Sequence, residues 1–449
     1  MQTLCLINFF KMKYFGTDGI RATFNETFLN EDFAIALGVA LGSFMEENAI
    51  IGKQVLIGRD TRPSGEKLLA AFCEGLAYKG YIGVSAGILP TPALAFGVLE
   101  KEMAMGVMIT ASHNPAQDNG FKFFSAVGTK LSDSEEESIE KMTLIKKRPT
   151  QIQNPESIEI IDSYINYISS IFPEDLLKNK KLVIDLSNGA TQQTTPAVLK
   201  NLGAEIHALN IGSGEINDGV GSEHPEIMAQ KVKEFKADFG FAHDGDGDRV
   251  IMCNSNGEVI PGDQILGLLA IHEEKKNRLP NNGFVATVHS NSGLDASLSG
   301  QGINLFRADV GDRKVSQMMR EKKLVLGGES SGHVVASKYL PTGDGLLTAL
   351  LVIRACYESN HNISSLSNKI VLWPSVEGSF KVKEKIPLEN CKPLNSALTK
   401  TRSSLENQGR ILLRYSGTEP KIRLLVEARD SEKANVAYQT IAKLIEKTL

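Results

Sequence analysis

Lys53-Gln-Val-Leu-Ile57, a polar loop, the run from Glu66 to Tyr78 and then Gly80-Tyr-Ile-Gly-Val84 form the unit from which most of this chain is built. The first and last stretches are short and apolar, which is typical of buried strands. The run between them has the length and the apolar spacing of a helix. Strand, helix, glycine, strand is the order expected of a largely parallel sheet covered by helices.

The same order occurs twice more along the chain. The second copy comprises Lys181-Leu-Val-Ile-Asp185, a helical run at 196–202 and Gly203-Ala-Glu-Ile206, and the third comprises Phe284-Val-Ala-Thr-Val288, a run at 294–298 and Gly302-Ile-Asn-Leu-Phe306. Each copy continues into another apolar strand that ends in a polar loop. These loops are Thr110-Ala-Ser-His-Asn-Pro115, Asp244-Gly-Asp-Gly-Asp-Arg249 and Gly328-Glu-Ser-Ser-Gly-His333. Open α/β sheets bind ligands beyond the carboxyl ends of their strands, so we expect the three loops to face one cleft.

Beyond about Val371 the strand–helix order is lost, and shorter strands without crossover spacing are followed by an amphipathic helix at 432–449. The sequence therefore predicts an α/β protein with three similar α/β/α domains, whose mixed and largely parallel sheets surround a central cleft, plus a smaller C-terminal α+β domain. The predicted domains are residues 12–163, 164–260, 261–371 and 372–449.

The composition is that of an ordinary globular protein. The 449 residues are 42% hydrophobic and carry a formal net charge of -4 with both signs well mixed, which offers no footprint for nucleic acid or an anionic membrane surface. Five scattered cysteines without a CxxC pair argue against a disulfide framework or a structural zinc site, so a reducing cytoplasm is expected. The apolar N-terminus lacks a basic leader, and we expect Met12 to be the natural start.

Asp244, Asp246 and Asp248 stand two residues apart on a loop that contains two glycines. In an extended backbone this spacing puts three carboxylates on one side, and oxygen ligands of this kind suit Mg2+. A calcium EF-hand needs glycine at its sixth position and glutamate at its twelfth, where this chain has Arg249 and Ser255. A solvated acidic turn is the remaining interpretation, although three like charges this close repel one another unless a cation is present.

Ser112 follows an apolar strand among small residues. It could be a nucleophile, or a side chain that caps the following turn. Two GxSxG patterns, centred on Ser85 and Ser330, are the signature of a serine hydrolase, but the first runs on into Pro90-Thr-Pro92 and the second into His333. A hydrolase would also leave the three aspartates unexplained.

Arg414-Tyr-Ser-Gly-Thr-Glu-Pro420 joins two predicted strands and concentrates hydrogen-bond donors, and Arg423 on the returning strand favours an anion site over a plain tight turn. The chain contains no GxxxxGK[ST] and no GxGxxG after a strand, so nucleotide sites of those kinds are not supported. Near the start, Tyr14-Phe-Gly-Thr-Asp-Gly-Ile-Arg21 is another candidate anion contact. Lys122 is a candidate base, unless it is simply a surface lysine.

Together these loops resemble the α-D-phosphohexomutase family. The resemblance runs from Met12 to the C-terminus and rests on four loops in the family's order, those quoted above from Thr110, Asp244, Gly328 and Arg414. It implies that Ser112 is carried as a phosphoserine and that Asp244, Asp246 and Asp248 hold one Mg2+ beside it, with Ser112 also on the metal.

The resemblance implies further roles for residues that match the family's motifs. The reaction centre would be lined by Arg21, His113, Lys122 and Arg249. The sugar or its phosphate would contact Thr17, Glu329, Ser331 and His333, while the phosphate that is not transferred would be held by Arg414, Ser416, Gly417, Thr418 and Arg423.

Within the family, Tyr14–Arg21, Val310-Gly-Asp-Arg313 and Thr342-Gly-Asp-Gly-Leu346 are similar to the branch that acts on glucosamine phosphate. The implied reaction is the isomerisation of glucosamine 6-phosphate and glucosamine 1-phosphate, through the phosphoserine and a sugar 1,6-bisphosphate that is both intermediate and activator. It would feed UDP-N-acetylglucosamine and cell-wall precursor synthesis. Gly247 and Ser330 stand where that branch usually has Ala and Gln, so a phosphomannomutase or phosphoglucomutase of the same family is an alternative.

A Mg2+-dependent sugar-phosphate phosphatase or a non-catalytic sugar-phosphate sensor would also use these loops, so the sequence leaves both functions open. Lys122 or His113 would assist proton transfer, and the family match favours Lys122. Tyr415 stands where the family more usually has a lysine that could contact the phosphate, and Lys421 would offset the loss of that contact. The C-terminal domain is expected to hinge, and a homodimer is compatible with the family.

Overall fold

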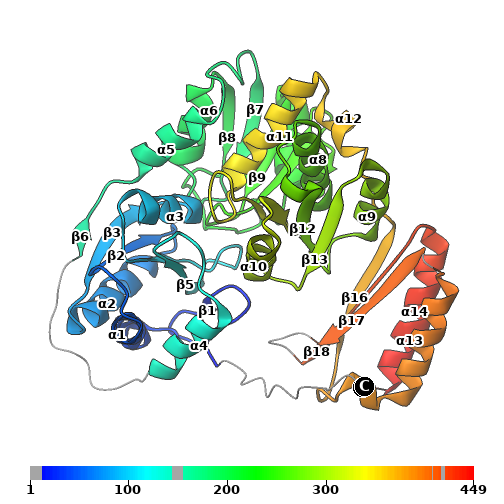
Figure 1. The fold of residues 1–449 in the computed structure, drawn as a ribbon, viewed down its shortest axis with the longest axis horizontal. Coiled ribbons are helices and arrows are strands. Elements are labelled where there is room, and N and C mark those ends of the chain that lie inside the picture. The colour runs from blue at the N-terminus through cyan, green and yellow to red at the C-terminus, as the bar shows by residue number, and fades with distance from the viewer. Residues whose placement is uncertain (1–12, 144–154, 407, 416–419, 449) are drawn as a thin grey trace.

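Residues 13–143, 155–406, 408–415 and 420–448 are described by a computed structural model, in which four separate sheets follow one another along the chain (Figure 1). Each sheet lies within one of the four predicted domains, whose boundaries stay predictions. The predicted start at Met12 and three residues of the Arg414 loop, Ser416, Gly417 and Thr418, lie outside the described residues.

The first sheet has six strands in the order β1-β5-β4-β2-β3-β6. Its strands are β1 (Ile20–Thr23), β2 (Gln54–Arg59), β3 (Ile82–Ile88), β4 (Met105–Ile109), β5 (Asp118–Ser125) and β6 (Glu156–Ser157). Its helices are α1 (Glu31–Glu47), α2 (Gly65–Tyr78), α3 (Thr91–Glu100) and α4 (Asp133–Met142). Side chains that alternate along β2 separate the two faces: Val55 and Ile57 pack with α1 and α2, while Leu56 packs with α3.

The second sheet has the order β11-β10-β9-β7-β8 and the third has the order β13-β12-β14-β15. The strands of the second are β7 (Lys181–Asp185), β8 (Glu205–Leu209), β9 (Phe239–His243), β10 (Val250–Asn254) and β11 (Val259–Ile260), with helices α5 (Ile161–Ser170), α6 (Thr194–Asn201) and α7 (Glu226–Phe235). The third unit comprises β12 (Gly283–Thr287), β13 (Asn304–Ala308), β14 (Leu326–Gly328), β15 (Val334–Ala336), α8 (Gly262–Lys275), α9 (Ser292–Leu298), α10 (Asp312–Lys322), α11 (Gly345–Ser359) and α12 (Ile363–Ser367).

One topology is repeated in these three sheets, which confirms the internal repeat. A central strand lies between two parallel neighbours, and an antiparallel strand follows on one side, giving β3-β2-β4-β5, β8-β7-β9-β10 and β13-β12-β14-β15. The polar loops predicted from the sequence leave the carboxyl ends of β4, β9 and β14. They therefore occupy equivalent positions in the three units.

The glycine of the strand, helix, glycine, strand order lies between the helix and the next strand, as that order predicts, and each next strand begins two residues after it. Gly80, Gly203 and Gly302 have φ angles of +75°, +93° and +70°, and each lies between its helix and the next strand. Glycine enters this left-handed region without the steric penalty of a Cβ, which is why it so often terminates helices.

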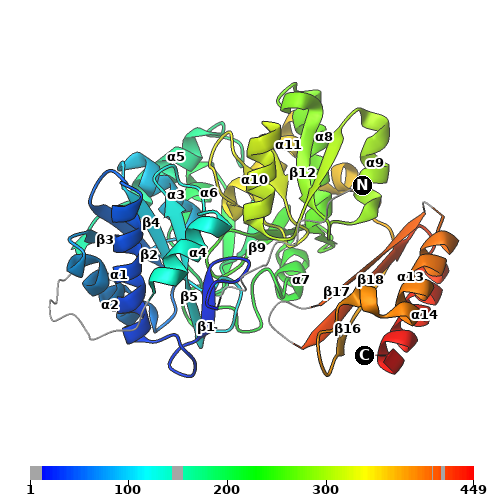
Figure 2. The same cartoon turned by 60° about the horizontal axis from the view of Figure 1, so that its bottom comes forward.

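The C-terminal unit is an antiparallel sheet in the order β16-β18-β17 with two helices on one side (Figures 1 and 2). It contacts the third unit, where Arg410 donates to the carbonyls of Val288 and Ser290. Its elements are β16 (Ser375–Lys381), β17 (Gly409–Tyr415), β18 (Lys421–Ala428), α13 (Lys392–Ser404) and α14 (Ser431–Thr448). It has its own buried apolar cluster, whereas a single cluster runs from the first unit through the third. None of the helices in the described ranges combines the length and the apolar character that a membrane span requires.

Replacing Gly75 with alanine is expected to destabilise the first unit, because α1 and α2 cross there with no room for a side chain. A Cβ on Gly75 would lie 2.1 Å from the carbonyl oxygen of Ile35, so the helices must separate. We expect a loss of about 1 to 3 kcal/mol in unfolding free energy, measured by urea denaturation. Gly300→Ala is the control, since nothing lies within 4 Å of that Cβ. Equal urea midpoints for the two variants would contradict this packing.

Candidate active site

Ser112 lies on the loop that follows β4 and is fully buried. Its φ angle of +53° places a residue with a side chain in the left-handed region, at a cost of about 1 to 3 kcal/mol. The Ser112 amide donates a hydrogen bond of 2.9 Å to Thr110 Oγ1. A strained, buried serine held by its own loop is typical of a functional position rather than of a turn cap.

The Ser112 hydroxyl donates a 2.7 Å hydrogen bond to Asp244 Oδ2. Asp244 begins the loop after β9, so this bond joins the carboxyl-end loops of the first and second sheets. His113 Nδ1 lies 3.5 Å from the same Ser112 oxygen. The prediction that these two loops face one another is confirmed.

The carboxylates of Asp244, Asp246 and Asp248 offer ligand atoms that lie within 4.8 Å of one another, and these residues are at most 1% exposed. A solvated acidic turn is therefore excluded. Within the described residues, Oδ1 of Asp246 and Oδ1 of Asp248 have no hydrogen-bond partner. Buried acceptors without donors carry a desolvation penalty, and a hard cation that prefers oxygen ligands would satisfy them. The donor set therefore fits Mg2+.

Repulsion within this cluster changes its titration. Burial, followed by the charges of Asp246 and Asp248, holds the pKa of Asp244 well above its usual range. Burial acts in the same direction on Asp248, but Lys122 and then His333 outweigh it and hold the pKa of that carboxyl well below its usual range. Asp244 is therefore harder to ionise than an isolated aspartate when no further cation is present.

Lys122 lies on β5 and is 1% exposed. Its Nζ donates to Asp246 Oδ2 at 2.8 Å and to Asp248 Oδ2 at 2.9 Å, and it lies 3.2 Å from Asp18 Oδ2. Burial acts to lower the pKa of Lys122, but the carboxylates of Asp18, Asp246 and Asp248 outweigh it and raise the pKa well above its ordinary value. In this arrangement Lys122 is a cation and a proton donor, not a free base.

His113 has the opposite character. Burial, followed by the positive charges of Arg249 and Arg21, lowers the pKa of His113 to about 3. The imidazole is therefore neutral at neutral pH, and the neighbouring positive charges oppose its protonation. The family resemblance favours Lys122 over His113 for assisting proton transfer, and that choice stays a prediction.

A chain of ion pairs around this centre links the first and third units. Arg21 and Lys130 both pair with Asp18, Lys130 also pairs with Asp312, and His333 Nε2 lies 3.6 Å from Asp312 Oδ2. Asp18 and Asp312 fall inside the motifs at 14–21 and 310–313, but those motifs gave neither residue a role. Lys130 carries no motif signal.

Of the predicted sugar-contacting residues, His333 is buried against the aspartate cluster, whereas Glu329 and Ser331 are more exposed. Arg249 and His333 are joined by an antiparallel bridge, and His333 Nδ1 lies 3.6 Å from Asp248 Oδ1. Glu329 Oε1 accepts a 3.0 Å hydrogen bond from the Gly311 amide. Ser331 and Glu329 are partly exposed, as a ligand site requires.

Thr17 is exposed, and its carbonyl accepts a 3.0 Å bond from Arg313 Nη2. This contact joins the N-terminal motif of the first unit to α10 of the third. Thr17 therefore lies where the first and third units meet, beside Asp18.

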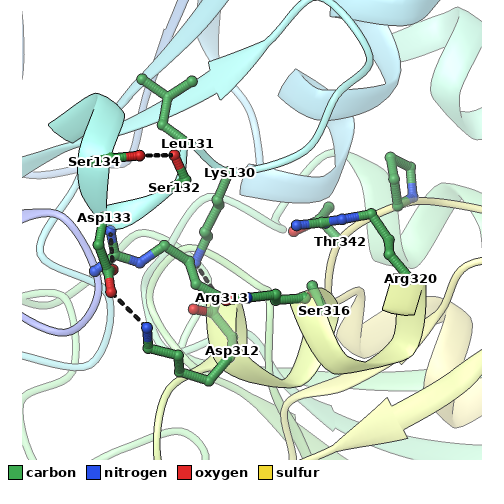
Figure 3. A pocket seen from close by; sticks show the side chains of 13 residues that line it. Lys130, Leu131, Ser132, Asp133, Ser134, Asp312, Arg313, Ser316, Arg320 and Thr342 are labelled. Carbon is green, nitrogen blue, oxygen red and sulfur yellow. Dashed lines mark hydrogen bonds and ion pairs between the residues drawn. The ribbon is translucent and has the colours of Figure 1, made fainter. Parts of the chain in front are cut away.

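A pocket of about 480 Å3 opens at this seam between α4 and α10 (Figure 3). Its lining includes Lys130, Asp312 and Thr342, and Lys314 pairs across it with Asp133 at 2.5 Å. Ser112 and the three aspartates are not part of the lining. The pocket therefore adjoins the reaction centre through Lys130 and Asp312 without containing it.

Arg414 and Arg423 are directly opposite one another on β17 and β18, which confirms the expected placement of Arg423 on the returning strand. Like charges in this relation repel, so the pair is suited to an anion. These arginines lie in the C-terminal unit, next to the His289 loop of the third unit and not in the Ser112 centre. Burial, followed by Arg414, Arg410 and Arg423, lowers the pKa of His289 to about 4.

Two residues that hold the Ser112 loop were missed from the sequence. Arg62, in the polar loop after β2, and Asn217, in the loop between β8 and α7, both donate to the Ser112 carbonyl. The signal available for Arg62 was its position beyond the carboxyl end of the strand beside β4. Asn217 carries no comparable signal.

Comparison with known proteins gives consistent matches over the chain. Models described as phosphoglucomutase/phosphomannomutase match residues 12–148 (alpha/beta/alpha domain I), 162–257 (domain II), 261–372 (domain III) and 379–443 (C-terminal domain). A phosphoglucosamine mutase of Nautilia profundicola is 40% identical over 444 residues, which cover 97% of this chain and 98% of that protein. One of Campylobacter fetus subsp. fetus is 39% identical over 453 residues, covering 98% and 100%.

A solved structure of a phosphoglucomutase/phosphomannomutase family protein from Burkholderia thailandensis superimposes with a TM-score of 0.79 at 25% identity. The match covers 96% of this chain and 97% of that one. The arrangement of the four units is thus shared with a solved structure.

Arg414→Gln is expected to raise the pKa of His289 toward its ordinary value of 6.5, because a nearby positive charge is removed. The His289 titration can be followed by NMR after assignment with His289→Gln, and the expected midpoint in the unmodified protein is about 4. Arg429→Gln is the control, since Arg429 lies over the Trp373 ring instead. An unchanged His289 midpoint in Arg414→Gln would show that the arginine pair does not act on this site.

Proposed function

The chain belongs to the phosphoglucomutase/phosphomannomutase family, and we propose that it interconverts glucosamine 6-phosphate and glucosamine 1-phosphate through a phosphorylated Ser112. It is an isomerase of the phosphomutase class. The observation that carries the route is the 2.7 Å bond from Ser112 Oγ to Asp244 within a cluster of three buried carboxylates. The choice of sugar is supported by relatives of about 40% identity that are named phosphoglucosamine mutase.

The reaction consists of two transfers between oxygen atoms. In the first, the bond from phosphorus to Ser112 Oγ breaks as a bond forms to a sugar hydroxyl, giving a sugar bisphosphate. In the second, the other phosphoryl group of the bisphosphate returns to Ser112. Each transfer releases one proton from the attacking hydroxyl and supplies one proton to the departing oxygen, so the cycle leaves the enzyme unchanged.

Two residues are suited to these proton movements. His113 Nδ1 lies 3.5 Å from Ser112 Oγ, and once a bound phosphate offsets the charges of Arg249 and Arg21 it accepts the proton of the sugar hydroxyl in the first transfer and returns it to the departing sugar oxygen in the second. Lys122, whose pKa is raised by the surrounding carboxylates, holds a positive charge beside the transferred group, supplies a proton to Ser112 Oγ in the first transfer and regains it from Ser112 in the second. Arg21 and Arg249 add fixed positive charge, since positioning and charge neutralisation are what phosphoryl transfer demands of a protein.

Asp244, Asp246 and Asp248 would hold Mg2+ together with the phosphate on Ser112. When bound, the ion neutralises charge on the phosphoryl group and lowers the repulsion between it and the attacking oxygen. Glu329 and Ser331 orient the sugar hydroxyls. Because the sugar must react at both ends, the phosphate that is not transferred needs one clamp for two orientations. The arginines of β17 and β18 are suited to that task.

Ser112→Ala is expected to lower the isomerisation rate more than about a thousandfold, because the residue that forms the covalent intermediate is lost. The rate is measured with glucosamine 6-phosphate, and inorganic phosphate is measured in the same samples to reveal a phosphatase. Intact mass after incubation with sugar bisphosphate should show one added phosphoryl group in the unmodified protein and none in Ser112→Ala.

Ser85→Ala is the matched control, since Ser85 occupies a GxSxG pattern but lies within β3. Its rate should stay within about threefold of the unmodified protein. An unchanged isomerisation rate in Ser112→Ala would refute the phosphoserine route, while phosphate release without isomerisation would identify a phosphatase. Glucose and mannose 6-phosphates assayed alongside test the sugar assignment.

Asp246→Asn is expected to weaken Mg2+ binding at least about tenfold, because a charged ligand becomes neutral. Calorimetric titration with Mg2+ alone provides the measurement, without any turnover. Asp238→Asn, at the other end of β9 where Asp238 pairs with Lys180, is the control and should bind Mg2+ as the unmodified protein does. Equal Mg2+ affinity in the two variants would exclude the aspartate cluster as the metal site.

A further inference from the structure

Arg62 lies beneath the Ser112 loop and is fully buried. All five of its N–H groups are used. Nε donates to Asp60 Oδ2 at 2.9 Å, Nη1 donates to the carbonyls of Pro115 and Asp118, and Nη2 donates to the carbonyls of Ser112 at 2.9 Å and Asn114 at 2.7 Å. One guanidinium therefore determines where four carbonyl groups of the serine loop point.

The charge of Arg62 is balanced by a network that returns to Ser112. Asp60, also fully buried, accepts from Arg62 and from Thr110 Oγ1 at 2.6 Å. Thr110 Oγ1 in turn accepts from the Ser112 amide at 2.9 Å. Ser112 is thus held at its amide and at its carbonyl by the same connected group. A buried ion pair is weak evidence for added stability, so its use here calls for another reason.

The second unit also donates hydrogen bonds to carbonyls of the serine loop. Asn217 Nδ2 donates to the carbonyls of Ser112 at 2.7 Å and Asn114 at 2.9 Å, and Asn217 Oδ1 accepts from Ser187 Oγ at 2.8 Å. The Ser112 carbonyl therefore has donors from two units on either side. Its direction, and with it the positive φ angle that turns Oγ toward Asp244, cannot change unless these bonds break.

We propose that Arg62 is a positioning residue, which holds Ser112 in the left-handed conformation so that its oxygen faces the aspartate cluster in both half-reactions. The proposal rests on the proposed function of Ser112. Arg62 acts through the loop backbone and touches neither sugar nor phosphate. Lysine cannot substitute, because an ammonium group lacks the planar fork that reaches several carbonyls at fixed angles.

Arg62→Lys and Arg62→Ala test the proposal. Both are expected to lower kcat about a hundredfold, with KM for glucosamine 6-phosphate within about threefold, because a displacement of about 1 Å at a reacting atom has effects of this size. Guanidinium ion added to Arg62→Ala should restore part of kcat. A role in stability alone would lower the melting temperature without a selective loss of kcat or a rescue by guanidinium.

Arg59→Lys is the matched control. Arg59 ends β2 just before the loop of Arg62, but it pairs with the exposed Glu66 at 3.0 Å, so kcat should be unchanged. A crystal structure of Arg62→Lys provides a readout that is independent of turnover, and Ser112 is expected to leave the positive φ region. Retention of that conformation, or of the unmodified kcat, would overturn the proposal. Failure of the proposed function would instead be seen in the unmodified protein, as an absence of isomerisation.

Discussion

Repulsion among three buried carboxylates organises the centre of this protein. Asp244, Asp246 and Asp248 place their ligand atoms within 4.8 Å of one another, away from water, where like charges interact strongly. Positive charge comes from other parts of the chain: Lys122 of the first unit bonds two of these residues, and His333 of the third unit lies 3.6 Å from Asp248. The acidic loop of the second unit is thus contacted by positive or protonatable side chains from both the first and the third unit.

Backbone geometry also determines where the Ser112 hydroxyl lies. Ser112 bonds Asp244 across the loops that follow β4 and β9, and its own φ angle is positive. Rigid elements thereby place the hydroxyl, and buried hydrogen bonds to the loop carbonyls retain it there. Conformational strain at one residue is maintained by the satisfaction of several polar groups around it.

Much of the fold and of the site was predictable from local patterns. Apolar periodicity, which reflects burial on one or two faces, predicted the strands at Lys181–Asp185 and around Val55. The breaks in that periodicity marked the three polar loops and the change of order beyond Val371. The catalytic assignment of Ser112 came from a family resemblance, since the loop alone could equally have been a turn cap. Arg62 and Lys130 were missed because their partners are distant in the sequence and no local pattern records such pairs.

Local sequence patterns were enough to specify the three repeated units, the C-terminal unit of different order and the residue types gathered at each strand end, because hydrophobic periodicity and turn chemistry act over a few neighbouring residues. Tertiary packing was needed to establish that Lys122 is a cation among buried carboxylates while His113 is neutral. The two charge states depend on burial and on charges contributed by other units, and such through-space effects are fixed only once the chain has folded.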